Sequence, residues 1–254
     1  MARFISKKLK SLVPFALLIM LWQLASSLQL WSSFVLPAPQ QVLATFWLML
    51  ERGELTEALL VSFRRIAIGF SLAFLLAFAL GLFTALFPKA LPFYGSLLDI
   101  FRHISPLSLV PLLILWFGIG ETPKLIVIIM ASFFPMLLNI NSGLASCDVK
   151  LIEVGRVLGF SKWQILRRIM LPNAVPGLLV GMRIGLGYSL RAIIGAEMIA
   201  AASGLGYLIL DAQTMSRTDK ALVGIIVIGL LGLLIDYVFK LLIAHFLPYY
   251  EEVD

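Results

Sequence analysis

Residues 66–87 have the sequence IAIGFSLAFLLAFALGLFTALF, a run of 22 residues without a charge. The nearest charged residues are Arg65 on one side and Lys89 on the other. An α-helix rises 1.5 Å per residue, so about 20 apolar residues cross the hydrocarbon core of a bilayer. The run is therefore long enough to form one membrane-spanning helix.

The rest of the chain repeats this pattern. No charge lies between Lys10 and Glu51 or between Lys124 and Asp148. Of the 254 residues 61% are apolar and 13% are charged, and the mean hydropathy is +1.01. These proportions exclude a disordered chain and an ordinary water-soluble enzyme. The sequence predicts an all-α membrane protein, a single domain over 1–254 with its core at 60–247. Six spans are expected, at about 12–30, 66–87, 100–119, 125–146, 177–202 and 221–247, the third interrupted by Pro106 and Pro111.

Basic residues predict how the chain is oriented. The net charge of +6 does not indicate nucleic-acid binding, because the Lys and Arg residues fall in short segments between apolar runs. With the N-terminus inside, the inner segments hold Arg3, Lys7, Lys8, Lys10, Lys89, Arg102, Lys150, Arg156, Lys162, Arg167, Arg168 and Lys240. The outer segments hold Arg52, Arg64, Arg65, Lys124, Arg217 and Lys220. Twelve against six predicts two cytoplasmic termini. The first apolar run resembles a signal peptide but continues through Trp31, which favours an uncleaved helix.

A shorter segment follows Leu36-Pro-Ala-Pro39. Within 40–51, Val42, Leu43, Phe46, Trp47 and Leu50 recur at helical spacing. This pattern is typical of an amphipathic helix lying in the outer interface, and equally of a loop helix packed on the bundle.

Residues 147–176, here called the elbow, differ from the apolar runs around them. Asp148 is a plausible N-cap, Gly159 occupies a C-terminal cap position, and Ser161-Lys-Trp-Gln164 has the form of a capping box. Pro172 is expected to end the second helix. The pattern predicts two short helices joined at a glycine, suited to docking on another protein. A loop that only connects two spans needs fewer residues.

The elbow carries a known signature. A resemblance to the cytoplasmic loop of ABC importer permease subunits is carried by Glu153-Val-Gly155, by Gly159 after three intervening residues, and by Ile169-Met-Leu-Pro172 after nine more. Only the two alanines of the E-A-A element are replaced, by Val154 and Gly155. With the cap pattern, the resemblance assigns coupling to a partner ATPase to Glu153, Gly155, Gly159, Ser161, Ile169, Leu171 and Pro172.

Three further motifs resemble the nitrate, sulfonate and taurine permease group. They are Trp116-Phe-Gly-Ile-Gly120, Glu197-Met-Ile followed by Gly204-Leu-Gly206, and Leu36-Pro-Ala-Pro39. The resemblance implies a bacterial inner-membrane permease that pairs with a second copy of itself, two ABC ATPase subunits and an external solute-binding protein. The family also includes importers of a thiamine pyrimidine precursor, so this alternative solute stays open. An ATPase-independent secondary carrier is a further alternative.

The chemistry of the chain agrees with a translocation subunit that is no enzyme. There is no G-x-x-x-x-G-K-[ST] phosphate loop, so ATP and Mg are expected in the partner and no cofactor in this chain. One cysteine, Cys147, and two histidines, His103 and His245, make no metal site or catalytic pair.

The fifth predicted span holds unusual groups. Arg183, Arg191 and Glu197 are ionisable residues at membrane depth, where a charge is costly and faces protein or water. All three are expected to line the translocation path. For Arg183, near the inner end, the alternative is a side chain that reaches the interface, and for Arg191 it is a bridge to Glu197 or Asp236. Gly177, Gly181, Gly185 and Ser189 form a small-residue stripe that packs a helix within the chain or in a second copy. A cationic path suits a sulfonate, taurine or nitrate.

Overall fold

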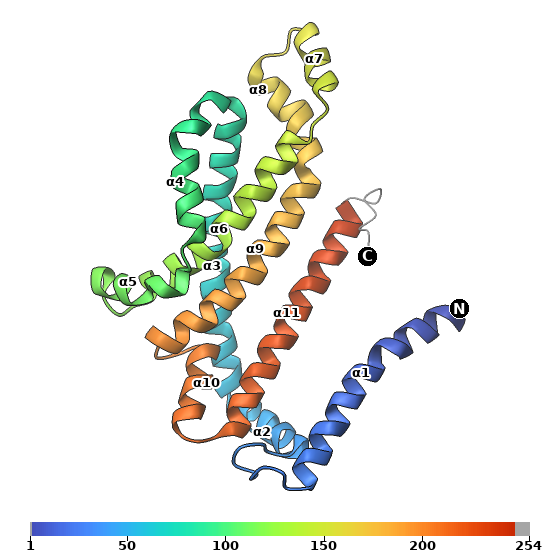
Figure 1. Cartoon of the computed structure of the whole chain (residues 1–254), viewed down its shortest axis with the longest axis vertical. Coiled ribbons are helices and arrows are strands. Elements are labelled where there is room, and N and C mark those ends of the chain that lie inside the picture. Colours follow the sequence, from blue (N-terminus) through green and yellow to red (C-terminus); the bar gives the residue numbers. More distant parts are fainter. Residues whose placement is uncertain (1, 247–254) are drawn as a thin grey trace.

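The computed structural model describes residues 2–246, with side chains for 13–244. This part of the chain is helical and contains no strand. The elements are α1 (Ala2–Ser27), α2 (Pro39–Glu51), α3 (Glu54–Leu86), η1 (Pro88–Ala90), α4 (Leu91–His103), η2 (Pro106–Leu109), α5 (Val110–Phe117), α6 (Glu121–Ala145), α7 (Val149–Val157), α8 (Lys162–Ile165), η3 (Leu166–Met170), α9 (Leu171–Ala200), α10 (Leu205–Thr214) and α11 (Thr218–Phe246). Figure 1 shows them as an elongated bundle.

Four helices in the described part are long and apolar enough to cross a membrane: Glu54–Leu86, Glu121–Ala145, Lys162–Ala200 and Thr218–Ala244. A fifth span is possible if the pair Pro88–His103 and Pro106–Phe117 counts as one. Val13–Ser27 is apolar but shorter. The prediction of a helical membrane bundle is therefore confirmed, whereas the count of six spans stays a prediction.

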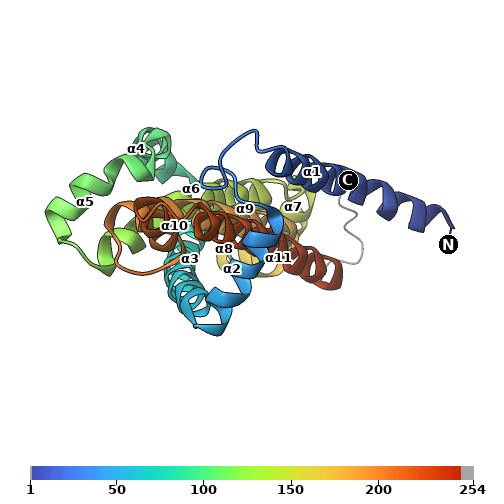
Figure 2. The ribbon, with the colours of Figure 1, turned by 90° about the horizontal axis from the view of Figure 1, so that it is seen from below.

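The third predicted span, 100–119, is interrupted at Pro106 as predicted, but not at Pro111. Helix α4 ends at His103, and the segment Pro88–His103 meets the next one, Pro106–Phe117, at a bend of 85°. Ser105 is extended (φ −68°, ψ 123°) because the ring of Pro106 disfavours a helical residue before it. Pro111, by contrast, lies in the first turn of α5, where a missing N–H costs nothing. Beyond the break, α5 projects sideways from the bundle in Figure 1 and Figure 2.

The helix predicted within 40–51 is confirmed as α2. It packs against α11 and α3, burying Val42, Thr45 and Met49. Leu43 and Trp47 on its other face stay exposed. Thr45 donates a 2.8 Å hydrogen bond to Asp219 of α11, which ties the helix to the bundle. The segment is thus packed on the bundle and keeps one apolar face outward.

The core forms where α3, α6 and α9 lie against one another. Gly69 and Gly81 of α3 approach α6 so closely that an added Cβ would lie 2.7 and 2.5 Å from side-chain atoms of Ile128 and Ile140. Ala73 and Ala77, on the same face of α3, are fully buried. Small residues therefore set how near these two helices come.

The glycine stripe of α9 also faces α6. An added Cβ would lie 3.0 Å from Asn139 O at Gly177, 2.8 Å from Asn139 Cβ at Gly181 and 2.7 Å from Met136 Cγ at Gly185. Ser189 is fully buried and donates to Gly185 O at 3.0 Å. These contacts are those of packing within one chain, the first of the two interpretations.

The prediction that Pro172 ends the second elbow helix is wrong. Residues 162–200 form one continuous element, with a single π-helical turn at Leu166–Met170 just before Pro172. A π turn widens the backbone and frees the carbonyl that a proline ring would otherwise strike. As a result α8 is the start of α9 and not a separate helix.

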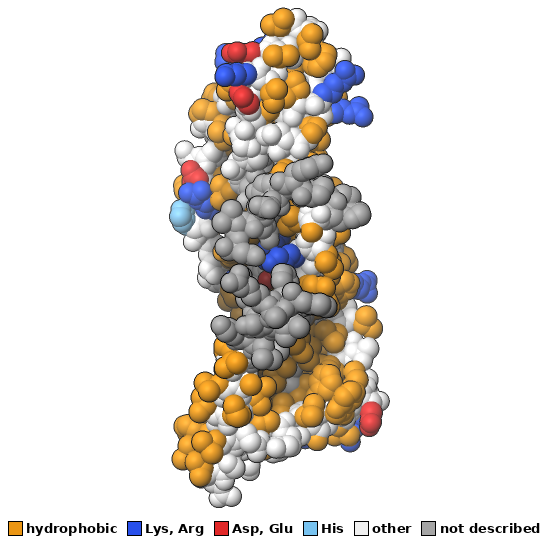
Figure 3. Space-filling model, turned by 90° about the vertical axis from the view of Figure 1, so that its right-hand side faces the viewer, with side chains coloured by type: hydrophobic (Ala, Val, Ile, Leu, Met, Phe, Trp, Pro, Cys, Tyr) orange, Lys and Arg blue, Asp and Glu red, His pale blue; other side chains and the backbone are white. Residues whose placement is uncertain are grey.

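The two ends of the bundle differ in character. Figure 1 shows α7 and α8 at one end, together with the junction of α3 and α4, and α2 with α10 at the other. Charged side chains gather over the end that α7 and α8 form (Figure 3). The candidate functional residues are divided between these ends and the middle.

Candidate functional site

The first helix of the elbow begins as predicted. Asp148 is its N-cap, and the carboxylate accepts a 2.9 Å hydrogen bond from the backbone N–H of Lys150. Such a cap satisfies one of the amide groups that the first turn leaves without a partner. The prediction for Asp148 is confirmed.

Gly159 closes that helix with a left-handed residue. Its φ is +75°, and an added Cβ would meet nothing within 4 Å. The N–H of Phe160 donates to Gly155 O at 3.0 Å and that of Gly159 to Arg156 O at 3.0 Å. These two bonds are the Schellman pattern, so backbone conformation and not space requires the glycine.

The second helix begins with the predicted capping box. Ser161 Oγ accepts from Gln164 N at 3.3 Å, and Gln164 Oε1 accepts from Ser161 N at 2.8 Å. The two elbow helices meet at Gly155, where an added Cβ would lie 2.8 Å from Ile169 Cδ1 and 3.3 Å from Ile165 Cγ1. Gly155 therefore lets α7 lie directly on the start of the 162–200 element.

The outer face of the elbow is apolar and uncovered. Val157 is 88% exposed, and Val154, Leu158 and Trp163 are also exposed. Of the predicted coupling residues, Gly155 is buried, Ile169 and Leu171 are half-buried, and Glu153, Gly159, Ser161 and Pro172 are exposed. Arg168 lies over the ring of Phe160 at 5.4 Å. The arrangement is an apolar surface with basic neighbours, formed by α7 and by the start of the element Lys162–Ala200.

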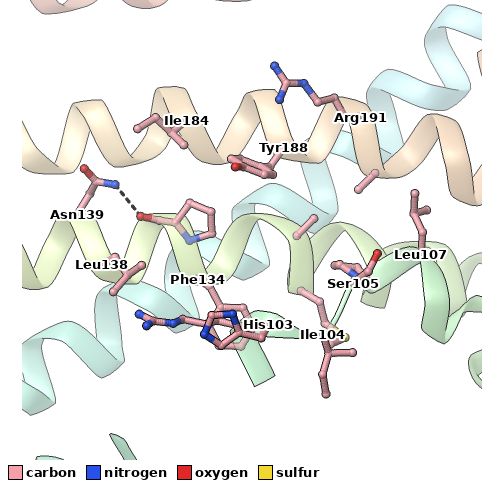
Figure 4. A pocket seen from close by; sticks show the side chains of 16 residues that line it. His103, Ile104, Ser105, Leu107, Phe134, Leu138, Asn139, Ile184, Tyr188 and Arg191 are labelled. Atoms are coloured by element: carbon pink, nitrogen blue, oxygen red, sulfur yellow. Dashed lines mark hydrogen bonds between the residues drawn. The ribbon is translucent and has the colours of Figure 1, made fainter. Parts of the chain in front are cut away.

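A second candidate site is a pocket of about 660 Å³ in the middle of the molecule, here called the central pocket. Its walls are the end of α4 with the break after it, the middle of α6 and the middle of α9. Figure 4 shows Tyr188 pointing from α9 toward α6, and Arg191, further along α9, extending away from α6 at the rim. Arg102 and His103 belong to the opposite wall.

Arg191 is exposed, and its guanidinium lies 5.8 Å from the centre of the Tyr188 ring. Among residues 13–244 no carboxylate forms an ion pair with it. The bridge from Arg191 to Glu197 or Asp236 is therefore wrong. Asp236 instead pairs with Arg183, at 3.1 Å, and Glu197 pairs with Arg65, at 2.7 Å. Arg102 has a carboxylate, Asp99, at 3.4 Å.

Glu197 lies in a group of polar and charged side chains, here called the Arg65 cluster: Ser62, Arg65, Glu121, Lys124 and Glu197, of which all but Glu121 are buried. Glu197 is fully buried and accepts from Arg65 Nη1 at 2.7 Å. Arg65 also donates to both carboxylate oxygens of Glu121, at 2.6 and 2.7 Å, and Lys124 Nζ lies 2.9 Å from Glu121. The positive charges of Arg65 and Lys124 are thus balanced by the two carboxylates, Glu121 and Glu197.

The Arg65 cluster also fixes the turn between α9 and α10. Gly206 N donates to Glu197 at 2.9 Å, and Leu205 N donates to Ser62 Oγ at 2.9 Å. Gly204 has φ +113°, and an added Cβ would overlap the carboxylate of Glu197. The motif Glu197…Gly204-Leu-Gly206 is thus a carboxylate enclosed by a glycine turn.

Sequence reasoning missed Arg65 and Ser62. Arg65 is counted above among the basic residues of the outer segments and Ser62 is not singled out, yet a signal is present. Ser62, Arg65, Gly69, Ala73 and Ala77 are spaced by three or four residues, so Arg65 lies on the small-residue face that packs. Its neighbour Arg64 lies off that face and is exposed.

Comparison with known proteins identifies what the chain is similar to. Residues 77–248 match the family described as "Binding-protein-dependent transport system inner membrane component". The chain is 36% identical to the putative aliphatic sulfonates transport permease protein of Bacillus subtilis (strain 168), over 92% of this chain and 85% of that protein. It is 33% identical to the taurine transport system permease protein of Escherichia coli (strain K12), over 96% and 90%.

Two further likenesses were found. The nitrate import permease protein of Synechocystis sp. is 31% identical, over 91% of this chain and 86% of its own length. A chain of the MetNI methionine ABC transporter in an inward-facing conformation superposes with a TM-score of 0.62 at 17% identity, covering 74% of this chain and 95% of that chain. The similarity to the MetNI chain is one of fold alone.

Proposed function

The chain belongs to the family of inner membrane components of binding-protein-dependent transport systems, and from that premise we propose how it works with its partners. It is a permease subunit of an ABC importer. In the proposal it spans the bacterial inner membrane as one permease domain, with both termini in the cytoplasm. It pairs with a second copy of itself and receives solute from an external binding protein. ATP and Mg are bound by a separate ATPase.

The observation that carries the proposal is the exposed face of the elbow. An apolar surface at the charged end of the molecule, with basic residues around it, is the chemistry of a docking surface. The caps on both elbow helices hold it in one shape, and the continuous element 162–200 connects it to the membrane part. Docking there delivers the ATPase's motion to a spanning helix.

The test changes one exposed residue of that face. Val157→Asp places a charge where the side chain is 88% exposed, so folding is spared while an apolar contact is lost. We expect the ATPase to stop co-purifying and uptake to fall at least tenfold, with normal membrane insertion. Val157→Thr, of similar shape and uncharged, is the matched control and should keep both. Co-purification of the ATPase with Val157→Asp at the wild-type level contradicts the proposal.

The proposed orientation has its own test. In a Cys147→Ser background, a membrane-impermeant thiol reagent added outside should label Gly53→Cys and Thr214→Cys, near α2 and α10. It should not label Lys89→Cys or Lys162→Cys at the opposite end. Labelling of Lys162→Cys from outside inverts the topology and removes the cytoplasmic docking surface with it.

For the solute, we propose a small anion. The relatives are named for aliphatic sulfonates, taurine and nitrate, all of which carry an anionic group. Arg191, in a pocket at mid-helix and without a carboxylate partner in residues 13–244, supplies a permanent positive charge for it. Arg191→Gln should assemble normally and lose most uptake, whereas Arg191→Lys should keep part of it. Arg183→Gln, which disrupts a charge pair outside the central pocket, is the comparison. Normal uptake by an assembled Arg191→Gln complex contradicts this role.

A further inference from the structure

One exposed arginine near the outer end of α3, Arg64, has no charged partner among residues 13–244. We propose that Arg64 and the cavity beside it bind one anionic phospholipid per chain, with the lipid phosphate on the guanidinium and an acyl chain along α3. The choice of the outer leaflet rests on the orientation proposed above, whereas the binding depends on neither that orientation nor transport. Three observations support it: the depth of Arg64, the charge around it and the shape of the cavity.

Arg64 lies at the depth of lipid headgroups. The charge-free run 66–87 begins two residues after it, within α3. As a helix, its 22 residues span about 33 Å, close to the hydrocarbon thickness of a bilayer. Arg65 is buried against the neighbouring helices, whereas Arg64 is exposed. The Arg64 guanidinium is therefore exposed at the boundary of the hydrocarbon, where phospholipid phosphates lie.

The charge of Arg64 is in excess. Its neighbour Arg65 uses all five of its N–H donors, on Glu121, Glu197 and Ser203. The Arg65 cluster is balanced within itself, so it leaves no carboxylate for Arg64. The Arg64 guanidinium keeps its own donors for an outside group, and their planar fork matches the oxygens of a phosphate. The cavity therefore attracts a group with a net negative charge.

The cavity beside Arg64 has a volume of about 420 Å³, within the range that holds a small organic group. Apart from the charged residues, its wall consists of Val61 and Ile68 of α3, Leu125 of α6 and Ser203. Ile68 is one turn below Arg64 on the same face of α3, and the exposed Leu72 is one turn further. A lipid with its phosphate on Arg64 can therefore lay an acyl chain along this apolar face.

The same charges disfavour a zwitterionic lipid. Among the described residues that line the cavity, Glu121 is the one carboxylate. It already accepts from Arg65 and from Lys124. The ammonium of phosphatidylethanolamine would thus lie near Arg64 without a carboxylate of its own. Phosphatidylglycerol, which has the phosphate and no amine, should bind more tightly.

The experiment measures lipid binding to the complete permease–ATPase complex by native mass spectrometry. The delipidated complex in detergent is titrated with phosphatidylglycerol or with phosphatidylethanolamine of the same acyl chains. We expect phosphatidylglycerol to bind at least about fivefold more tightly, and glycerol phosphate at the same concentration not to displace it. Equal affinity for the two lipids overturns the proposal. Displacement by glycerol phosphate also overturns it, because the site would then take a soluble phosphate.

Substitution of the arginine locates the preference. Arg64→Gln should abolish the preference for phosphatidylglycerol, and Arg64→Lys should retain part of it. Arg52→Gln is the matched control, because Arg52 is an exposed arginine on the same side that does not line the cavity. It should keep the full preference. An unchanged preference in Arg64→Gln, or an equal loss in Arg52→Gln, overturns the proposal. A loss confined to affinity for the external binding protein in Arg64→Gln overturns it too.

A gained charge tests the electrostatic part. Val61 is half-buried in the cavity wall, so Val61→Glu adds a carboxylate that cancels the excess charge. The preference for phosphatidylglycerol should disappear in Val61→Glu and persist in Val61→Gln, whose side chain is of equal size. An equal loss in both variants overturns the proposal. The proposed function fails separately, if the wild-type complex with its binding protein imports no solute.

Discussion

Polar groups serve opposite purposes in the elbow and in the Arg65 cluster. In the elbow, Asp148, Ser161 and Gln164 complete the ends of short helices, and the apolar side chains between them face outward. In the Arg65 cluster, charged side chains pair with one another, all but Glu121 in the interior, and join three helices and a turn. The elbow is shaped by contacts within a few residues, and its apolar face is exposed. The cluster holds together segments that are up to 143 residues apart.

The largest loss of stability is expected from a change at Arg65. Removal of one partner from a buried ion pair leaves an uncompensated charge and costs about 3–5 kcal/mol. We expect Arg65→Leu to lower the free energy of unfolding by that order, because Glu197 stays fully buried without its cation. The midpoint of heat-induced loss of the monodisperse peak in detergent measures it. Arg64→Leu, at the exposed neighbour, should shift the midpoint little, and equal shifts in both variants contradict the burial of Arg65.

The next effect is expected at Gly204. An added methyl group would overlap the carboxylate of Glu197 at a backbone with φ +113°. The strained backbone alone costs about 1–3 kcal/mol, so Gly204→Ala should be clearly destabilising. Gly187→Ala in α9, where nothing lies within 4 Å of an added Cβ, should be neutral or up to about 1 kcal/mol more stable. The same heat measurement applies, and a stable Gly204→Ala would show that the turn does not enclose Glu197.

In the elbow the equivalent change should affect coupling more than stability. Gly159→Val forces a β-branched residue into the left-handed region, at a local cost of about 1–2 kcal/mol. The elbow projects beyond the core, so the heat midpoint of the membrane part should barely move. Uptake and ATPase co-purification should both fall. Gly159→Asn, which tolerates this conformation, should retain more of each. Normal uptake and co-purification in Gly159→Val would contradict the role of the elbow.

The smallest effect is expected at the capping box. Ser161→Ala removes one cap hydrogen bond, worth about 1 kcal/mol. Hydrogen exchange at the backbone amides of 162–165 should quicken several-fold, while exchange in α3 and α6 stays the same. Ser161→Asp restores an acceptor and should restore protection. Unchanged exchange in Ser161→Ala would show that packing at Gly155 alone holds α8.

The same contrast explains what could be predicted. Asp148, Gly159 and the Ser161–Gln164 box act within six residues, so their spacing alone reveals them. Charge-free length reveals the apolar helices. The partner of Glu197 could not be found in this way, because Arg65 lies 132 residues earlier and the choice among arginines depends on how helices pack. The prediction for Pro172 failed for a related reason. A regular helix excludes a proline from its interior, but the π turn just before Pro172 allows the helix to continue.

The unbroken element 162–200 has a mechanical consequence. At 1.5 Å per residue its 39 residues span about 58 Å, nearly twice the hydrocarbon thickness of a bilayer. One tip is the elbow and the other carries Glu197. If such a lever tilts by about 10° around its midpoint, geometry moves each tip by about 5 Å, in opposite directions. A displacement of the elbow in one direction would therefore move the Arg65 cluster by the same distance in the opposite direction.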